Sequence, residues 1–312
     1  MGDFVISVNA ILPMFFVMAL GYGARALGWI HEKEISDINK IAFRIFLPCL
    51  LYYNVYCSDL SGSVNPLLMA YAVGGVLLTF ALAVGYALLT EKDPARRGVV
   101  IQGIFRSNYV IMGIPVATAL VGADQLGTVS IMIAVIVPIF NMLAIVVLEV
   151  FRGQKPKPLH VLGQIVKNPL VIASVLGVLT LLLGIRLPYV IEQTVKNISG
   201  IASPLQLFLL GAFFQFSGLK KYRRELTAVS IGKLIVSPAL FLGLGALLGF
   251  RDVAFVSLLG IFASPNAVNS FTMAQQMGGD AELAGDIVVV TSAASMLTMF
   301  LWVFLFKSLG MF

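Results

Sequence analysis

The chain contains ten apolar stretches, each long enough to form one helix through a lipid bilayer. A hydrocarbon core of about 30 Å needs about 20 apolar residues in helical conformation. Only 12% of the residues are charged, which is about half the share of a soluble domain. The sequence therefore predicts an all-α integral membrane protein with ten transmembrane helices. The predicted spans are Phe4–Leu27, Ile35–Val55, Leu67–Leu89, Val99–Val121, Thr128–Phe151, Pro169–Ile185, Tyr189–Phe216, Leu226–Phe250, Val253–Met277 and Ile287–Met311.

Basic residues gather in the loops on one side of these spans. The loops after the first, third, fifth and seventh spans hold most of the Lys and Arg, whereas the opposite loops hold few. Loops rich in Lys and Arg stay cytoplasmic, so we expect a multi-pass protein of the inner (plasma) membrane with both termini extracytoplasmic. The basic residues of the crowded side are Arg25, Lys33, Lys92, Arg96, Arg97, Arg152, Lys155, Lys157, Lys167, Lys220, Lys221, Arg223 and Arg224.

The second half of the chain repeats features of the first half at a nearly constant offset. Four residues recur in kind 156 positions later, namely Pro13, Lys40, Pro48 and Asp124. A period of this length holds five helices, an odd number, so the second half must enter the membrane upside down. Many secondary transporters are built from such inverted repeats. The expected parts are a first five-helix repeat at 1–151, a cytoplasmic linker at 152–168 and a second repeat at 169–312.

Two of the predicted helices, the fourth and the ninth, are interrupted by polar residues at matched places. The fourth contains GIFRSN at Gly103–Asn108, and the ninth contains GIFASPN at Gly260–Asn266. Non-helical backbone at membrane depth survives only where protein or water satisfies its polar groups. We predict that both helices break near mid-membrane and cross, with half-helix N-termini directed at a carboxylate guest. The expected substrate-binding residues are Arg106, Ser107, Asn108, Ser264, Pro265 and Asn266.

A plainer interpretation is a pair of kinked helices whose polar side chains pack between neighbours. Because two interruptions occur at matched places in the two halves, we favour a substrate-binding site over kinked helices. The charged residues well inside the spans, Arg44, Arg106 and Lys233, are basic, whereas acidic residues cluster near span ends, at Glu149, Glu192 and Asp286. This indicates an anionic substrate with Arg106 as its binding charge. Snorkelling to the interface or pairing with a loop acid is an equal alternative for Arg106. For Arg44 and Lys233 the favoured interpretation is snorkelling or contact with lipid head groups.

Other polar residues have simpler expected roles. We expect Asn141 and Gln206 to bond to neighbouring helices, although both could face the cavity. We expect Asp124 and Asp280 to cap helices rather than to bind a ligand.

The segments SNYVIMGIP, ALVGADQ and ASPNAVNSFTMAQQMGGD resemble the auxin efflux carrier family, and the likeness covers essentially the whole chain. Bacterial members of that family carry malate, malonate and other organic acids. The resemblance implies an elevator-type carrier, with helices 1, 2, 6 and 7 as a scaffold and as the contact of a homodimer. Helices 3–5 and 8–10 would form the moving transport unit.

Two features of the sequence bear on how far the resemblance transfers. Pro265–Asn266 fits the family pattern of Pro followed by a polar residue, whereas the first crossover has Ser107 in place of the Pro. Asn108 matches the polar residue of the family pattern, and the resemblance therefore implies that it contacts the substrate. The long cytoplasmic loop of plant auxin carriers is replaced by a short linker at 152–167, which favours an organic acid over auxin.

The sequence thus predicts a secondary active transporter of a small organic anion, a mono- or dicarboxylate, with an anion channel on the same scaffold as the alternative. An enzyme is disfavoured because no nucleophile with its base, metal cluster or phosphate-binding Gly loop is recognisable. We therefore assign no catalytic residue, cofactor or metal. The expected partners are the organic anion and the lipid bilayer, without nucleic acid.

Overall fold

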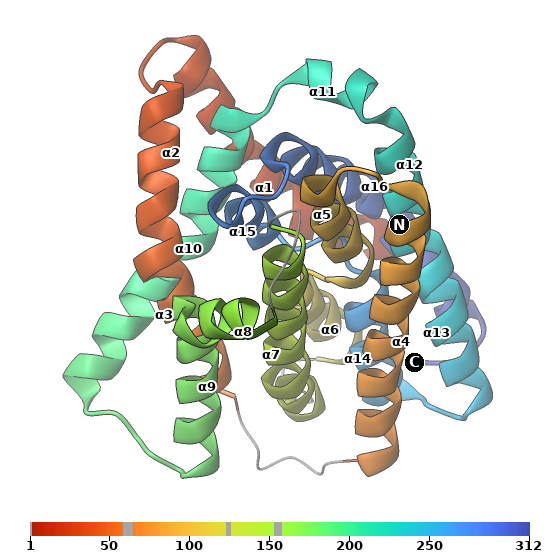
Figure 1. Cartoon of the computed structure of the whole chain (residues 1–312). Coiled ribbons are helices and arrows are strands. Elements are labelled where there is room, and N and C mark those ends of the chain that lie inside the picture. Colours follow the sequence, from red (N-terminus) through yellow and green to blue (C-terminus); the bar gives the residue numbers. More distant parts are fainter. Residues whose placement is uncertain (1, 59–64, 123–125, 153–157) are drawn as a thin grey trace.

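The computed structural model of the chain is all-helical, and the residues that it describes include no strand (Figure 1). The structure describes residues 2–58, 65–122, 126–152 and 158–312, with side chains at 12–58, 65–122, 126–152 and 162–312. The predicted cap Asp124 and the linker residues 153–157 lie outside the described residues.

The helices follow one another with short connections. The first half contains α1 (Gly2–Ala26), α2 (Glu32–Ile41), η1 (Ala42–Phe46), α3 (Leu47–Tyr56), α4 (Pro66–Thr90), α5 (Pro94–Phe105), η2 (Tyr109–Gly113), α6 (Ile114–Val121) and α7 (Gly127–Val150). The second half contains α8 (Pro158–Lys167), α9 (Pro169–Leu182), α10 (Tyr189–Phe213), α11 (Phe216–Lys221), α12 (Arg223–Ile231), η4 (Gly232–Val236), α13 (Ser237–Leu247), α14 (Asp252–Ala263), α15 (Asn269–Met277) and α16 (Ala281–Ser308).

Several helices are long and apolar enough to cross a membrane. Within the described residues, five helical stretches meet this condition: Pro66–Thr90, Pro94–Val121, Gly127–Val150, Arg223–Leu247 and Ala281–Ser308. Shorter apolar helices lie at Leu12–Ala26, Pro169–Leu182 and Asp252–Ala263. Length and composition therefore identify a multi-pass membrane protein.

Local capping moves some helix starts away from their predicted positions. The last helix, predicted to start at Ile287, starts at Ala281 because the side chain of Asp280 accepts a hydrogen bond from the Leu283 N–H. The prediction that Asp280 caps a helix is thus confirmed. The predicted linker contains a helix, α8, which runs across the direction of α7 and α9 and contacts both (Figure 1).

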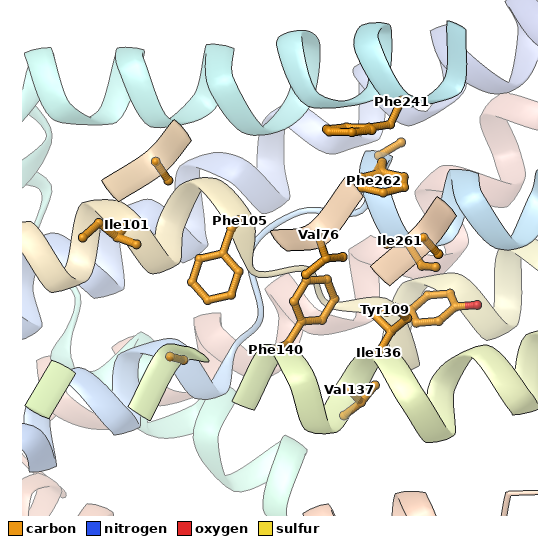
Figure 2. Close-up of a cluster of buried hydrophobic side chains, with 14 of the residues drawn as sticks. Val76, Ile101, Phe105, Tyr109, Ile136, Val137, Phe140, Phe241, Ile261 and Phe262 are labelled. Atoms are coloured by element: carbon orange, nitrogen blue, oxygen red, sulfur yellow. The ribbon is translucent and has the colours of Figure 1, made fainter. Parts of the chain in front are cut away.

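Aromatic side chains fill the space around the end of α5. The ring of Phe105 lies 5.1 Å from that of Phe80 and 6.1 Å from that of Phe140 of α7, centroid to centroid. Phe241 of α13 stacks on Phe262 of α14 at 4.5 Å. Figure 2 shows Phe105 of α5, Phe140 of α7, Phe241 of α13 and Phe262 of α14 in one cluster of buried side chains. Dense apolar packing therefore surrounds the point where α5 stops.

Helices α1 and α10 approach each other very closely, and glycine permits the approach. A Cβ atom added at Gly21 would lie 2.0 Å from the carbonyl oxygen of Phe208, and one at Gly211 would lie 1.9 Å from that of Met18. Small residues let membrane helices bring their backbones together in this way. Gly23, on the same helix as Gly21, has no atom within 4 Å of its would-be Cβ.

This contrast gives a test of the α1–α10 contact. Gly21→Ala should lower the apparent unfolding temperature in detergent, because overpacking costs about 1–3 kcal/mol. The matched control Gly23→Ala should leave that temperature unchanged. Equal unfolding temperatures for the two variants would contradict the close contact.

Candidate functional site

Both helices that carry the polar clusters are interrupted at those clusters. Helix α5 ends at Phe105, and residues 106–108 are non-helical before η2 begins at Tyr109. Helix α14 ends at Ala263, and α15 begins at Asn269 after a second non-helical segment. The residues at both interruptions are buried, so their backbone polar groups need partners within the protein.

The two interruptions touch and satisfy each other. The Asn108 N–H donates to the carbonyl oxygen of Pro265 at 2.8 Å. The side-chain amide of Asn266 lies 2.9 Å from the carbonyl oxygen of Gln102, 3.2 Å from that of Gly103 and 3.3 Å from that of Arg106. The carbonyls of Gln102 and Gly103 belong to the last turn of α5, and that of Arg106 belongs to its C-cap residue, where a helix leaves acceptors unpaired; the Gln102 carbonyl also accepts from the Arg106 N–H. Asn266 therefore caps α5 from the other half of the chain.

The glycines of the repeated GIF sequences are positions of close packing. A Cβ atom at Gly260 would lie 2.7 Å from the ring of Tyr109, and one at Gly103 would lie 2.9 Å from Cγ1 of Val229. The repeat of these letters thus reflects two helices that need a small residue just before their interruption.

Arg106 lies inside the protein, with 1% of its surface exposed. Its guanidinium donates to Oδ1 of Asn141 at 2.6 Å and to the sulfur of Met273 at 2.9 Å. Longer contacts reach Oε1 of Gln102 at 3.4 Å and Oγ of Ser270 at 3.5 Å. Burial of the whole side chain contradicts the snorkelling alternative. All of these acceptors are neutral, so they leave the positive charge uncompensated.

Lys233 is a second buried cation beside the crossing. Its side chain is 1% exposed, and its ammonium donates to the hydroxyl of Ser107, which in turn donates to the carbonyl oxygen of Ile261. The prediction that Lys233 snorkels is wrong, because η4 turns it toward the interruption of α5. Arg44 is exposed, as snorkelling requires. Among the described side chains, neither Arg106 nor Lys233 forms an ion pair.

A small cavity of about 60 Å³ opens at the crossing. Its wall comes from α3, the first interruption with η2, α7, α10, and the end of the second interruption with the start of α15. Of the predicted site residues, Arg106, Ser107 and Asn108 line it. The lining does not include Ser264, Pro265 or Asn266, which are buried behind it. The polar lining residues that we did not predict as binding residues are Asn54, Asn141, Ser203, Gln206 and Asn269.

Three amide groups at this cavity have an unpaired polar atom. Nδ2 of Asn108, Nε2 of Gln206 and Oδ1 of Asn269 are buried and have no hydrogen-bond partner among the described residues. We expected Gln206 to bond to a neighbouring helix, but its Nε2 atom has no such partner among the described residues. A buried unpaired polar group costs about 1–3 kcal/mol, and the cavity wall thus carries two free donors, on Asn108 and Gln206, and one free acceptor, on Asn269.

Two half-helices start at the cavity. Tyr109, the first residue of η2, and Asn269, the first residue of α15, both line it. The first N–H groups of a helix lack partners within the regular helix and carry a partial positive charge. At α15 the N–H groups of Ser270 and Phe271 already donate to the carbonyl oxygens of Ala267 and Val268, so this terminus contributes mainly its partial charge. Among the residues that the structure describes, no Asp or Glu lines the cavity, and no cluster of His, Cys, Asp and Glu could hold a metal ion. The site therefore offers donors and positive charge.

Comparison with known proteins agrees with a role in transport. The family model described as "Membrane transport protein" matches residues 6–160 and 158–303. The chain is 24% identical to an "Uncharacterized transporter" of Methanothermobacter thermautotrophicus over 302 residues, 96% of this chain and 98% of the relative. It is also 24% identical to a "Putative malonate transporter" of Rhizobium meliloti over 305 residues, 96% of this chain and 95% of the relative.

The cap supplied by Asn266 can be tested by substitution. Asn266→Ala should lower stability by about 1–3 kcal/mol, because buried carbonyls of α5 lose their donor. Ser264→Ala is the matched control, since the Ser264 hydroxyl bonds only to Gly260 of its own helix. Thermal unfolding in detergent measures both variants. If Asn266→Ala lowers the unfolding temperature no more than Ser264→Ala does, Asn266 is not the cap of α5.

Proposed function

Because the chain belongs to the membrane transport protein family, we propose that it is a secondary active transporter of a small organic anion across the cytoplasmic membrane. The resemblance to auxin efflux carriers is confirmed by this match. A transporter of this kind needs a solute site inside the membrane that can be closed to water, and the crossing of the interrupted helices meets this need.

The observation that carries the proposal is the chemistry of the cavity wall. Arg106, the unpaired amides of Asn108 and Gln206, and two half-helix N-termini face one space without an acidic neighbour. A carboxylate accepts several hydrogen bonds and has the sign that a helix N-terminus favours. One bound carboxylate would satisfy the buried amide donors and compensate the charge of Arg106.

The proposed architecture is ten transmembrane helices in two inverted five-helix repeats, 1–151 and 169–312, joined at 152–168. Interrupted helices at matched places in the two halves support it, as does the alternation of basic loops. In this arrangement both termini are extracytoplasmic.

The proposed movement is an elevator displacement of a transport unit against a scaffold. The scaffold consists of α1, α2 with α3, α9 and α10, and the extensive contacts α1–α10 and α3–α9 support its integrity. The transport unit contains both interrupted helices and moves with its cargo. A homodimer through the scaffold follows from the family resemblance alone.

A dicarboxylate of the size of malonate is the first substrate to test, since one relative is named as a malonate transporter. Labelled malonate should enter proteoliposomes in a saturable manner and show counterflow against internal unlabelled malonate. A current far above carrier turnover, without counterflow, would instead identify an anion channel on the same scaffold.

Arg106→Ala should reduce malonate uptake roughly ten- to hundredfold, because a hydrogen bond to a charged group is worth about 1.5–3 kcal/mol. Arg44→Gln removes an exposed cation away from the cavity and should leave uptake unchanged. The unfolding temperature of each purified variant verifies its fold. A folded Arg106→Ala variant with normal uptake would remove Arg106 from the site.

A further inference from the structure

Asp286 is a buried carboxyl group on α16, the helix after α15, and it does not line the cavity. It lies in the second turn of α16 and is 2% exposed. Its Oδ2 atom is buried and has no hydrogen-bond partner among the described residues. The two other acids at this end of α16 are paired. Asp280 bonds Arg96 and the Tyr222 hydroxyl, and Glu282 bonds Lys221. Asp286 thus stands apart from its neighbours.

The short helix α11 covers this carboxyl group. A Cβ atom at Gly218 would lie 2.2 Å from Oδ2 of Asp286, so only glycine permits the contact. The backbone of Gly218 offers the carboxyl no donor, because its N–H donates to the carbonyl oxygen of Gln215 and its own carbonyl accepts from Tyr222. Helix α11 therefore shields Asp286 from water, and the backbone of Gly218 supplies no hydrogen bond in place of those that water would make.

The charges around Asp286 do not favour its anion. The charged groups that act most strongly on Asp286 are Glu282, Asp280 and Lys221, of which two are acidic, and the ammonium of Lys221 is already bonded to Glu282. Helix α15, which packs against α16, carries no ionisable side chain. Among the described side chains of the other packed elements, the following charged groups have partners of their own: Arg25 of α1 with the carbonyls of Ala212 and Phe213, Arg96 of α5 with Asp280, Arg97 of α5 with the carbonyl of Glu91, Glu225 of α12 with Arg96, Lys233 of η4 with Ser107, and Glu192 of α10 with Tyr56. The other described charged residues of these elements are exposed, namely Lys196, Lys220, Arg223, Arg224 and Asp252.

We propose that Asp286 is a proton-binding site whose proton is held while α11 covers it and released when α11 lifts away. An isolated carboxylate out of water is costly, so a covered Asp286 is neutral and an uncovered one ionises. Helix α11 connects α10 to α12 over the ends of the neighbouring helices (Figure 1). In the proposed elevator, α10 belongs to the scaffold and α12 to the transport unit, so the connector must move in each cycle.

This inference rests on the proposed transport function and adds a proton as the coupled ion. Each cycle would move one proton on and off Asp286 as α11 closes and opens, together with the organic anion. No bond other than the O–H bond of the carboxyl group forms or breaks.

Proteoliposomes that contain a pH-sensitive dye test the coupling. Wild-type protein should take up labelled malonate faster from mildly acidic than from mildly alkaline medium and move protons with it. Asp286→Asn, which mimics the protonated side chain, should lose both the pH dependence and the proton movement. Glu282→Gln is the matched control one turn away and should keep both. An Asp286→Asn variant with the wild-type pH profile and proton movement would overturn the proposal.

A second readout does not depend on transport. A carboxyl group that is protonated in the folded state but ionised in the unfolded state makes stability fall as the pH rises. The unfolding temperature of the wild type should therefore drop between mildly acidic and mildly alkaline buffer by several degrees more than that of Asp286→Asn. Equal drops would overturn the proton site. Absent malonate uptake by the wild type would contradict malonate transport, whereas the unfolding comparison would still decide on Asp286.

Discussion

A peptide group without a hydrogen-bond partner costs several kcal/mol in hydrocarbon, and the rest of this structure depends on how the chain meets that constraint where two helices stop. The two interruptions pair with each other: the Asn108 N–H with the Pro265 carbonyl, and the Asn266 amide with the last turn of α5. Each interruption therefore depends on the other for hydrogen bonds to its backbone polar groups. The crossing is thus one structural unit built from two halves of the chain, and it holds two half-helix N-termini at one cavity.

The same region concentrates positive charge where the bilayer would resist it. Arg106 and Lys233 are buried on either side of Ser107, and their partners are neutral oxygens and one sulfur. An ion pair with an internal acid would have removed the need for an anionic guest. Because the described residues provide none, the positive potential remains available at the crossing.

The length of the apolar stretches predicted where the chain is helical. The polar clusters predicted where two helices stop, because polar groups within an apolar stretch are costly unless the protein surrounds them. The direction of single side chains was less predictable. Lys233 was expected to snorkel because sequence alone does not show which way its turn faces. Beyond Pro265 the backbone is non-helical, so the cavity is lined by Asn269 rather than by Ser264 or Asn266. Gln206 comes from a helix distant in sequence, and only the tertiary fold brings it to Asn108.

The central claim is that an organic anion binds between the two half-helix starts. A crystal structure of the protein with bromomalonate, located by the anomalous scattering of bromine, tests it most directly. The account predicts bromine density in the cavity, with carboxylate oxygens within hydrogen-bond distance of Arg106 and the Asn108 amide. Density elsewhere, for example beside the exposed basic loops, with none in the cavity would contradict it.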